Sequence, residues 1–251
     1  MAEIIRVLVP LDSHAAETFQ TALEYAKAIC EKTGAREIIL LTHTKSQLDH
    51  TSLSRFLGDR TVRALAKGPV SVVTGVNLQA ETMRTLRWPR GPAVILVYYA
   101  ETEILDLADG TRNVVGVVAV PDYPGQADGW AERWGVIVHG QERQAPGPLI
   151  DDPVVVRALE TLTQVINLST GLVHPRDKEM ADEILRILRA KGHADPTPTI
   201  RSWAIRNGWK PNHAIKLEAL SGKIWELRTK PSLSKFHNPQ ARYDRWRSGE
   251  E

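Results

Sequence analysis

Residues 114–120 form the run Val-Val-Gly-Val-Val-Ala-Val, and this stretch decides the fold. An uninterrupted run of small and β-branched apolar residues, too short for a helix, is typical of a strand buried on both faces of a parallel sheet. Similar runs recur at residues 4–10, 37–42, 70–76, 93–99 and 135–139. The sequence therefore predicts a series of buried strands over residues 4–140.

The segments between these runs have the amphipathic spacing of helices. We expect helices at residues 15–32, 52–67, 78–86, 102–108 and 126–133. A repeated alternation of strand and helix implies right-handed crossovers that place helices on both faces of a sheet. Residues 1–140 are therefore predicted to be an α/β domain, with a Rossmann-like, doubly wound and mainly parallel sheet.

Polar residues follow most of the predicted strands. In an open parallel sheet, ligands bind in the crevice beyond the carboxyl ends of the strands. A ligand site is therefore predicted there, formed by Asp12, Ser13, His14, His43, Lys45, Asn77, Tyr99 and Glu101. The alternative is that polar loops are ordinary at this edge and that Asp12 and Ser13 only cap the next helix.

Motifs for phosphate chemistry are missing from the sequence. Neither a G-x-G-x-x-G turn nor a G-x-x-x-x-G-K-[ST] loop occurs, so no cofactor is predicted, although a nucleotide remains a candidate ligand. Asp12, His14, His43 and Glu101 are the candidates if the protein is an enzyme acting on a nucleotide or nucleobase. Because no catalytic signature is present, the sequence weighs against an enzyme.

The segment Arg6-Val7-Leu8-Val9-Pro10-Leu11-Asp12, with Ala22–Ala26 and residues 38–42, resembles the opening of the universal stress protein family. The resemblance covers about the first 42 residues. It implies a Rossmann-like fold and, because many members bind ATP through an Asp at the end of the first strand, a nucleotide contact at Asp12. The family's later G-x-x-G phosphate motif has no counterpart at residues 114–140.

A change of composition divides the chain. Residues 141–153 are rich in Pro and Gly and are predicted to be a linker. Beyond them no strand pattern remains, and helices are expected at residues 154–167, 178–190, 199–207 and 212–227. We therefore predict a small all-helical module at residues 154–227, followed by a basic aromatic tail at residues 228–251.

Residues 200–219 of this module fit the helix-turn-helix pattern in part. Ala204, Gly208 and Leu217 occupy the positions of the small residue, the turn glycine and an apolar anchor. Asn212 is expected to cap the second helix, whose first turns would present Lys210, His213 and Lys216 to a nucleic acid. A purely structural helix pair is the alternative.

Charge is segregated along the chain. Residues 184–251 contain 14 Lys and Arg against 6 Asp and Glu, whereas residues 1–183 contain 18 against 24. In the tail, basic and aromatic side chains alternate, which suits phosphate neutralisation and base stacking. The predicted nucleic-acid contacts there are Arg228, Lys230, Lys235, Arg242, Arg245, Trp246 and Arg247. The alternative is a strap whose aromatic residues dock on the protein itself.

Other classes of protein are less consistent with this sequence. The histidines lack metal-site spacing, the apolar runs are shorter than a membrane span, and a single cysteine, Cys30, excludes an internal disulfide. We predict a cytoplasmic protein that binds no metal and no membrane. The leading prediction is a nucleic-acid-binding protein whose front domain senses a ligand or mediates assembly. The other hypotheses are an enzyme at the crevice and a protein-interaction subunit, including a homo-oligomer.

Overall fold

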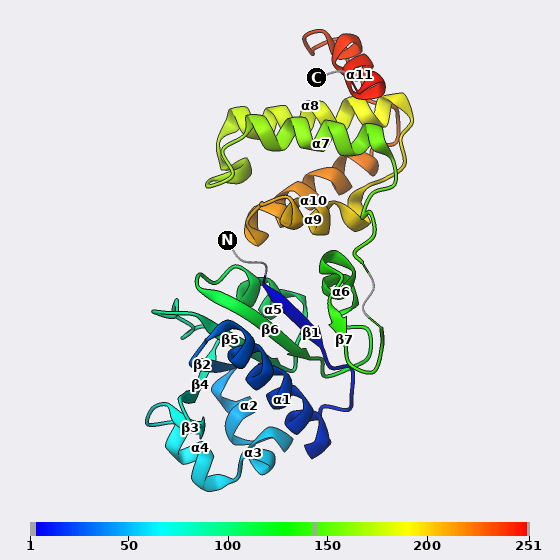
Figure 1. The fold of residues 1–251 in the computed structure, drawn as a ribbon. Helices are drawn as coiled ribbons and strands as arrows, with labels where there is room; N and C mark the ends of the chain where they lie inside the picture. Colours follow the sequence, from blue (N-terminus) through cyan, green and yellow to red (C-terminus); the bar gives the residue numbers. More distant parts are fainter. Residues whose placement is uncertain (1–3, 143–144, 250–251) are drawn as a thin grey trace. The chain divides into compact units, whose positions relative to one another are not determined.

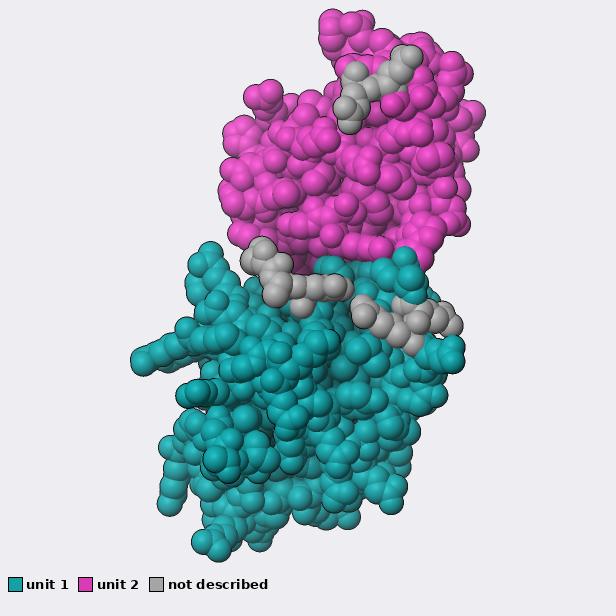
Figure 2. Space-filling model, in the orientation of Figure 1, with its two compact units in different colours: residues 1–146 teal, residues 147–251 magenta. Residues whose placement is uncertain are grey.

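A computed structural model describes residues 4–142 and 145–249, so the predicted segments 1–140, 141–153 and 228–251 each extend outside the described residues. The chain divides into two compact units, Met1–Pro146 and Gly147–Glu251. Figures 1 and 2 show the elements and the two units. Each unit is described here by itself.

The first unit is built on one sheet of seven strands in the order β3-β4-β2-β5-β6-β1-β7. All neighbouring strands run parallel except β3 and β4, which confirms an α/β fold with a mainly parallel sheet. The strands are β1 (Ile5–Leu8), β2 (Glu37–Thr42), β3 (Val70–Val73), β4 (Val76–Thr82), β5 (Ala93–Tyr98), β6 (Val114–Val120) and β7 (Ile137–Val138).

Helices cover both faces of this sheet (Figure 1). One face packs against α1 (Ala16–Thr33), α2 (Lys45–Asp49), α3 (Ser52–Leu57) and α4 (Asp59–Leu65). The other face packs against α5 (Thr102–Asp109) and α6 (Asp128–Trp134). The glycine in the middle of β6 has a packing reason, because a Cβ at Gly116 would lie 2.6 Å from Cγ2 of Ile29 in α1.

Three predictions in this unit are wrong. Residues 52–67 are not one helix, because α3 ends at Leu57 and α4 begins at Asp59, with Gly58 at φ +77° between them. Residues 70–76 are not one strand and residues 78–86 are not a helix, because the chain turns at Thr74 and Gly75 and continues as β4. Gly75 adopts φ +81°, which suits a tight hairpin turn. In β4, Leu78 is buried and pairs with Ile38 of β2, so the alternation of polar and apolar residues follows a strand and not a helix.

The described residues of unit 2 are 147–249. Helices are the only regular secondary structure among them. They are α7 (Pro153–Val165), the short 3-10 helix η1 (Gly171–Val173), α8 (Pro175–Lys191), α9 (Thr197–Arg206), α10 (Pro211–Trp225) and α11 (Pro239–Ser248). Within this unit α11 packs on α7 and α8, while α9 and α10 lie on the other side of that pair (Figure 1).

Candidate functional site

The loops that follow β1 and β6 meet at the carboxyl edge of the sheet. These strands are neighbours, but β1 continues into α1 on one face and β6 continues into α6 on the other face. Such a point, where two adjacent connections leave in opposite directions, is where open α/β sheets bind ligands. Here Ser13 Oγ, which is fully buried, donates a hydrogen bond of 2.8 Å to Oδ1 of Asp122.

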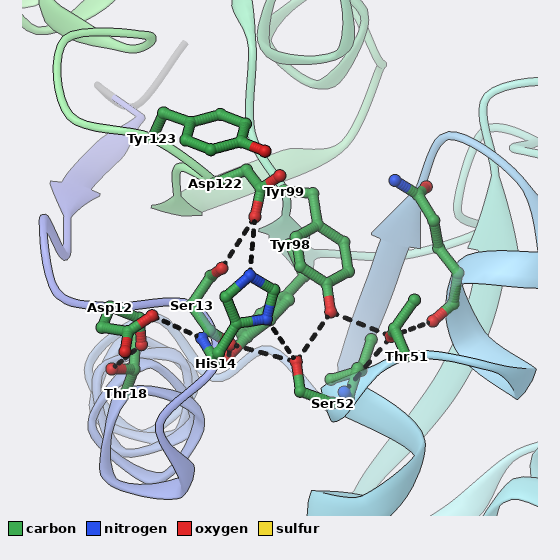
Figure 3. Close-up of polar contacts among 12 residues, drawn as sticks. Asp12, Ser13, His14, Thr18, Thr51, Ser52, Tyr98, Tyr99, Asp122 and Tyr123 are labelled. Carbon is green, nitrogen blue, oxygen red and sulfur yellow. Dashed lines mark hydrogen bonds and ion pairs between the residues drawn. The ribbon is translucent and has the colours of Figure 1, made fainter.

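A chain of polar side chains extends from this point (Figure 3). His14 places Nε2 at 3.7 Å from Oδ1 of Asp122 and Nδ1 at 3.1 Å from Oγ of Ser52. Ser52 Oγ lies 3.1 Å from the hydroxyl of Tyr99, which in turn donates to Oγ1 of Thr51 at 2.9 Å. Residues from β1, α3, β5 and β6 are therefore joined through hydrogen bonds.

The direction of these hydrogen bonds restricts the chemistry. Thr51 Oγ1 donates to the carbonyl oxygen of Gln47 at 2.5 Å, so it accepts the proton of Tyr99. The Ser52 hydroxyl donates to the carbonyl oxygen of Ser13 at 3.5 Å and also lies 3.1 Å from the Tyr99 oxygen. Ser52, His14 and Asp122 have the residue types of a catalytic triad, but Nε2 of His14, at 3.7 Å, is beyond hydrogen-bond distance of Asp122, and Ser52 donates to the carbonyl oxygen of Ser13. This arrangement orients polar groups and does not activate Ser52 as a nucleophile.

Tyr98 anchors the loop that carries these residues. Its hydroxyl donates a 2.8 Å hydrogen bond to the carbonyl oxygen of Ser13, and its ring is fully buried. Burial, and then the charges and dipoles of Tyr99, Asp12 and Asp122, raise the pKa of Tyr98 above its ordinary value. Tyr98 therefore remains a neutral hydrogen-bond donor that holds the backbone of Ser13 in place.

A second polar contact lies at the ends of β2 and β5. Nε2 of His43 lies 3.2 Å from the carbonyl oxygen of Tyr99 and 3.3 Å from Oε1 of Glu101. Tyr99 has φ +61°, an uncommon backbone conformation for a residue with a side chain. This conformation lets the carbonyl oxygen meet His43 while the hydroxyl reaches Thr51 and Ser52.

The structure places the predicted crevice residues at this edge, with the one exception of Asn77. Asp12 is exposed, and its carboxylate accepts the backbone N–H of His14 at 2.9 Å. Lys45 is exposed as the first residue of α2. Asn77 lies near the beginning of β4, paired in register with Glu37, and is therefore at the opposite edge of the sheet. Asn77 was wrongly predicted to lie in the crevice because the hairpin of β3 and β4 was not predicted.

Thr51 and Ser52 are site residues that the sequence analysis did not identify. Thr51 caps α3, because its side chain accepts the backbone N–H of Leu53. A Thr-Ser pair before a helix is the signal of such a cap, and it carries no information about which strand ends the cap will reach. The meeting of Ser52 with His14 and Tyr99 depends on how α3 packs on the sheet.

In unit 2, the predicted nucleic-acid contacts of α10 are partly in place. Lys210 and Lys216 are exposed, and Lys210 Nζ donates to the carbonyl oxygen of Ser169 at 2.9 Å. Asn212 is exposed but does not cap α10, because the helix already begins at Pro211 and Lys210 is its N-cap residue. A proline is favoured as the first residue of a helix, where its missing N–H is not needed.

The prediction that His213 faces outward is wrong. His213 is only 6% exposed, and its ring packs so closely on Gly171 that a Cβ there would lie 2.4 Å from its Cγ atom. Burial, and then the positive charges of Lys210 and Lys216, lower the pKa of His213, although a hydrogen bond to the backbone of Leu168 opposes this. A neutral, buried imidazole pins α10 to η1 and does not contact a partner.

The tail also differs from the prediction in two residues. Trp246 is only 5% exposed, and its indole N–H donates to Oγ1 of Thr161 in α7 at 3.1 Å. Arg242 forms an ion pair with Glu183 in α8 at 2.6 Å. These side chains bind the protein itself, as expected for a docked strap, and Trp246 offers no free ring for a base.

The other predicted tail residues are exposed. Arg228, Lys230 and Lys235 lie between α10 and α11, and Arg245 and Arg247 lie on α11. Arg247 is 3.5 Å from Asp244 of the same helix. The helices α10 and α11 lie on opposite sides of the α7–α8 pair (Figure 1).

Two classes of site find no support in the part of the chain that the structure describes. No group of three or more His, Cys, Asp or Glu side chains there is arranged to hold a metal ion. None of the described helices combines the length and apolar character that crossing a membrane requires.

Comparison with known proteins adds one match. No curated protein and no solved structure is detectably similar to this chain. The first 42 residues match no universal stress protein family, so that resemblance is not confirmed. Residues 151–247, which include all the helices of unit 2, match the family described as "Domain of unknown function (DUF1889)".

Proposed function

We propose that unit 2 binds nucleic acid through α10, as the second helix of a helix-turn-helix pair. The support for the pair is its packing. Trp203, Ala204, Trp209 and Leu217 are buried on its inner side, and Gly208 adopts φ +89° in the turn between α9 and α10. This combination of buried anchors and a left-handed turn glycine suits a helix pair that presents its second helix to a groove.

The observation that carries the proposal is an exposed stripe on α10. Asn212, Lys216, Ala219 and Lys223 follow one another at helical spacing, and all four are exposed. Ile215 lies beside them and is 41% exposed, which gives this surface an apolar contact for a sugar or a thymine methyl group. Glu218, the one acidic residue within α10, is half-buried and lies off this stripe.

Oligonucleotide binding to matched variants tests the proposal. Fluorescence anisotropy of labelled duplex and single-stranded DNA and RNA would be measured at low and near-physiological salt. We expect K216Q/K223Q to weaken binding about tenfold at low salt, and to reduce the slope of log affinity against log salt by about 0.9 for each lost phosphate contact. The matched control is R245Q/R247Q, which removes the same charge from α11. Unchanged affinity and slope in the α10 variant would contradict the proposal.

A second candidate function is the binding of a small planar ligand with hydroxyl groups in the first unit. Asp122 favours it, because its carboxylate lies at the meeting point of two loops while the next residue, Tyr123, is 64% exposed and can contact a ring (Figure 3). An enzyme acting on a nucleoside or nucleotide would use the same edge. Thermal shifts with a panel of nucleosides and nucleotides, lost in Asp122→Asn, would support this function, and no shift with any of them would contradict it.

A further inference from the structure

The connection between β4 and β5, residues 83–92, carries an unusual set of side chains. It runs from the carboxyl end of β4 back to the beginning of β5 without forming a helix. Arg84, Arg87 and Arg90 are exposed along it, and Trp88 is 62% exposed. The guanidinium carbon of Arg112, from the loop before β6, lies 4.3 Å from the ring centroid of Trp88.

The backbone of this connection is held firmly. Asn113 Nδ2 donates a 2.8 Å hydrogen bond to the carbonyl oxygen of Pro89, which is itself buried. Met83 and Leu86 pack against the core on the α5–α6 face of the sheet. The arginines therefore project from a fixed loop, and ordering them for a ligand does not require the loop to fold.

The positive charge of this surface is not neutralised within the part of the chain that the structure describes. None of Arg84, Arg87, Arg90 and Arg112 is within ion-pair distance of a described carboxylate. Arg84 and Arg87 line a hollow of about 410 Å³. Glu81 also lines it, so the hollow contains one carboxylate, which accepts a hydrogen bond from Thr85, beside the two arginines. Three exposed arginines along one connection, with a fourth against its exposed indole, are suited to an extended polyanion that also carries rings.

We propose that this surface, formed by Arg84, Arg87, Trp88, Arg90 and Arg112, binds single-stranded nucleic acid. The guanidinium groups contact successive phosphates, since their planar donors match phosphate oxygens. A base stacks on the part of the Trp88 ring that Arg112 leaves open. A single strand is required because the base faces of a duplex are already stacked, whereas an unpaired base is free to contact the ring.

This surface is separate from the other two sites. It runs from the carboxyl end of β4, where the Met83 N–H donates to the carbonyl oxygen of Thr42, to the beginning of β6, where Asn113 contacts Pro89, and it shares no residue with the crevice. It also belongs to the first unit, so it does not depend on α10. Its success or failure is therefore independent of the proposal for unit 2.

The test compares four variants of the full chain by anisotropy with a labelled 12-nucleotide single strand and its duplex. R84Q/R87Q/R90Q/R112Q removes the charges, and K32Q/R60Q/R63Q/K67Q removes four exposed charges elsewhere in the same unit. W88A removes the ring, and W88F keeps an aromatic face. Urea unfolding would show that each variant is folded. K216Q/K223Q in the same titration measures the contribution of α10.

We expect the single strand to bind more tightly than the duplex at low salt. The loop variant, R84Q/R87Q/R90Q/R112Q, should lose at least tenfold in affinity and most of its salt dependence. The matched control, K32Q/R60Q/R63Q/K67Q, should lose less than threefold in affinity. W88A should lose about tenfold, and W88F should retain most of the affinity, because stacking needs only an aromatic face.

Four results would overturn the proposal. The first is an equal loss of affinity in the loop variant and its control, which would indicate nonspecific attraction by positive charge. The second is equal binding of duplex and single strand with no effect of W88A. The third is binding to phosphatidylserine vesicles that requires these residues while oligonucleotides do not bind, which assigns the surface to a membrane. Loss of binding in K216Q/K223Q alone would also overturn it and leave the α10 proposal standing.

Discussion

Ser13 donates its hydroxyl proton to Asp122 across 109 residues of sequence, and this 2.8 Å hydrogen bond joins the loops that follow β1 and β6. The carboxylate of Asp122 therefore has a fixed position at the edge of the sheet. We expect Ser13→Ala to lower the free energy of unfolding by about 1 kcal/mol, the usual net value of one hydrogen bond. Urea unfolding measures it. Ser54→Ala, on the half-buried face of α3, removes a hydroxyl that bonds only locally and should cost less.

The contact between Gly171 and His213 predicts a strong effect of a single methyl group. A Cβ at Gly171 would lie 2.4 Å from the ring of His213, at a backbone φ of +55°. We expect Gly171→Ala to cost about 2–4 kcal/mol, from overpacking and from the left-handed backbone together. Gly192→Ala is the matched control, since φ there is +88° but nothing lies within 4 Å of its Cβ.

A double-mutant cycle separates these two causes. His213→Ala removes the ring that the new methyl group would meet, so Gly171→Ala in that background should cost only the backbone term, about 1–2 kcal/mol. Urea unfolding of the four proteins provides the coupling energy. Additive effects would show that the ring of His213 does not restrict residue 171.

Asp152 makes the stability of unit 2 depend on acidity. Burial by itself raises the pKa of this carboxyl, but hydrogen bonds from His193 and from the backbone N–H groups of Val154 and Val155 outweigh it, so the pKa lies below its ordinary value of 3.8. The ionised group therefore stabilises the fold above pH 4, and this contribution is lost as the pH falls through the lowered pKa.

The expected effect of substituting Asp152 follows from the role of this residue as a helix cap. Asp152→Asn should lower the free energy of unfolding by about 1 kcal/mol at pH 7, a modest value because the side chain is 34% exposed. The difference between variant and parent should shrink towards pH 3. Urea titrations at both pH values measure it, and a difference that stays constant with pH would contradict the assignment.

Asp109 has a structural role that its sequence context does not suggest. It is the last residue of α5, and its carboxylate accepts hydrogen bonds from Arg6 at 2.8 Å and from the indole of Trp130 at 2.7 Å. Asp109→Ala leaves both buried donors without this acceptor and should cost about 3 kcal/mol. Glu103→Ala changes an exposed residue of the same helix and should cost less than about 0.5 kcal/mol in the same thermal or urea unfolding experiment.

The features that the sequence predicted well depend on local pattern. The run from Val114 to Val120 is a buried central strand, and its neighbours in sequence follow the expected alternation. Residues 78–86 were misassigned as a helix because Leu78 and Leu86 also suit helical spacing, and residues 70–76 were misassigned as one strand because the turn at Gly75 is marked by a single glycine. The displacement of Asn77 from the predicted crevice is a consequence of that one error.

Contacts between distant segments were beyond local pattern. Nothing near Ser52 indicates that it meets His14, and nothing near Trp246 indicates that it is buried on α7. A basic and aromatic tail has the same composition whether it binds a phosphate or its own chain. The burial of His213 likewise depends on Gly171, which lies in a different segment. Such contacts are decided by packing energies that no short window of sequence contains.

The docking of α11 on α7 has a consequence for the order in which this chain acquires its structure during synthesis. Trp246 reaches Thr161 across 85 residues, and Arg157 donates to the carbonyl oxygens of Trp246 and Arg247. A nascent chain on the ribosome would carry the outer face of α7 uncovered until those last residues emerge from the exit tunnel. For a helical unit this is a long-range closure, which slows folding relative to bundles whose neighbouring helices pair in succession.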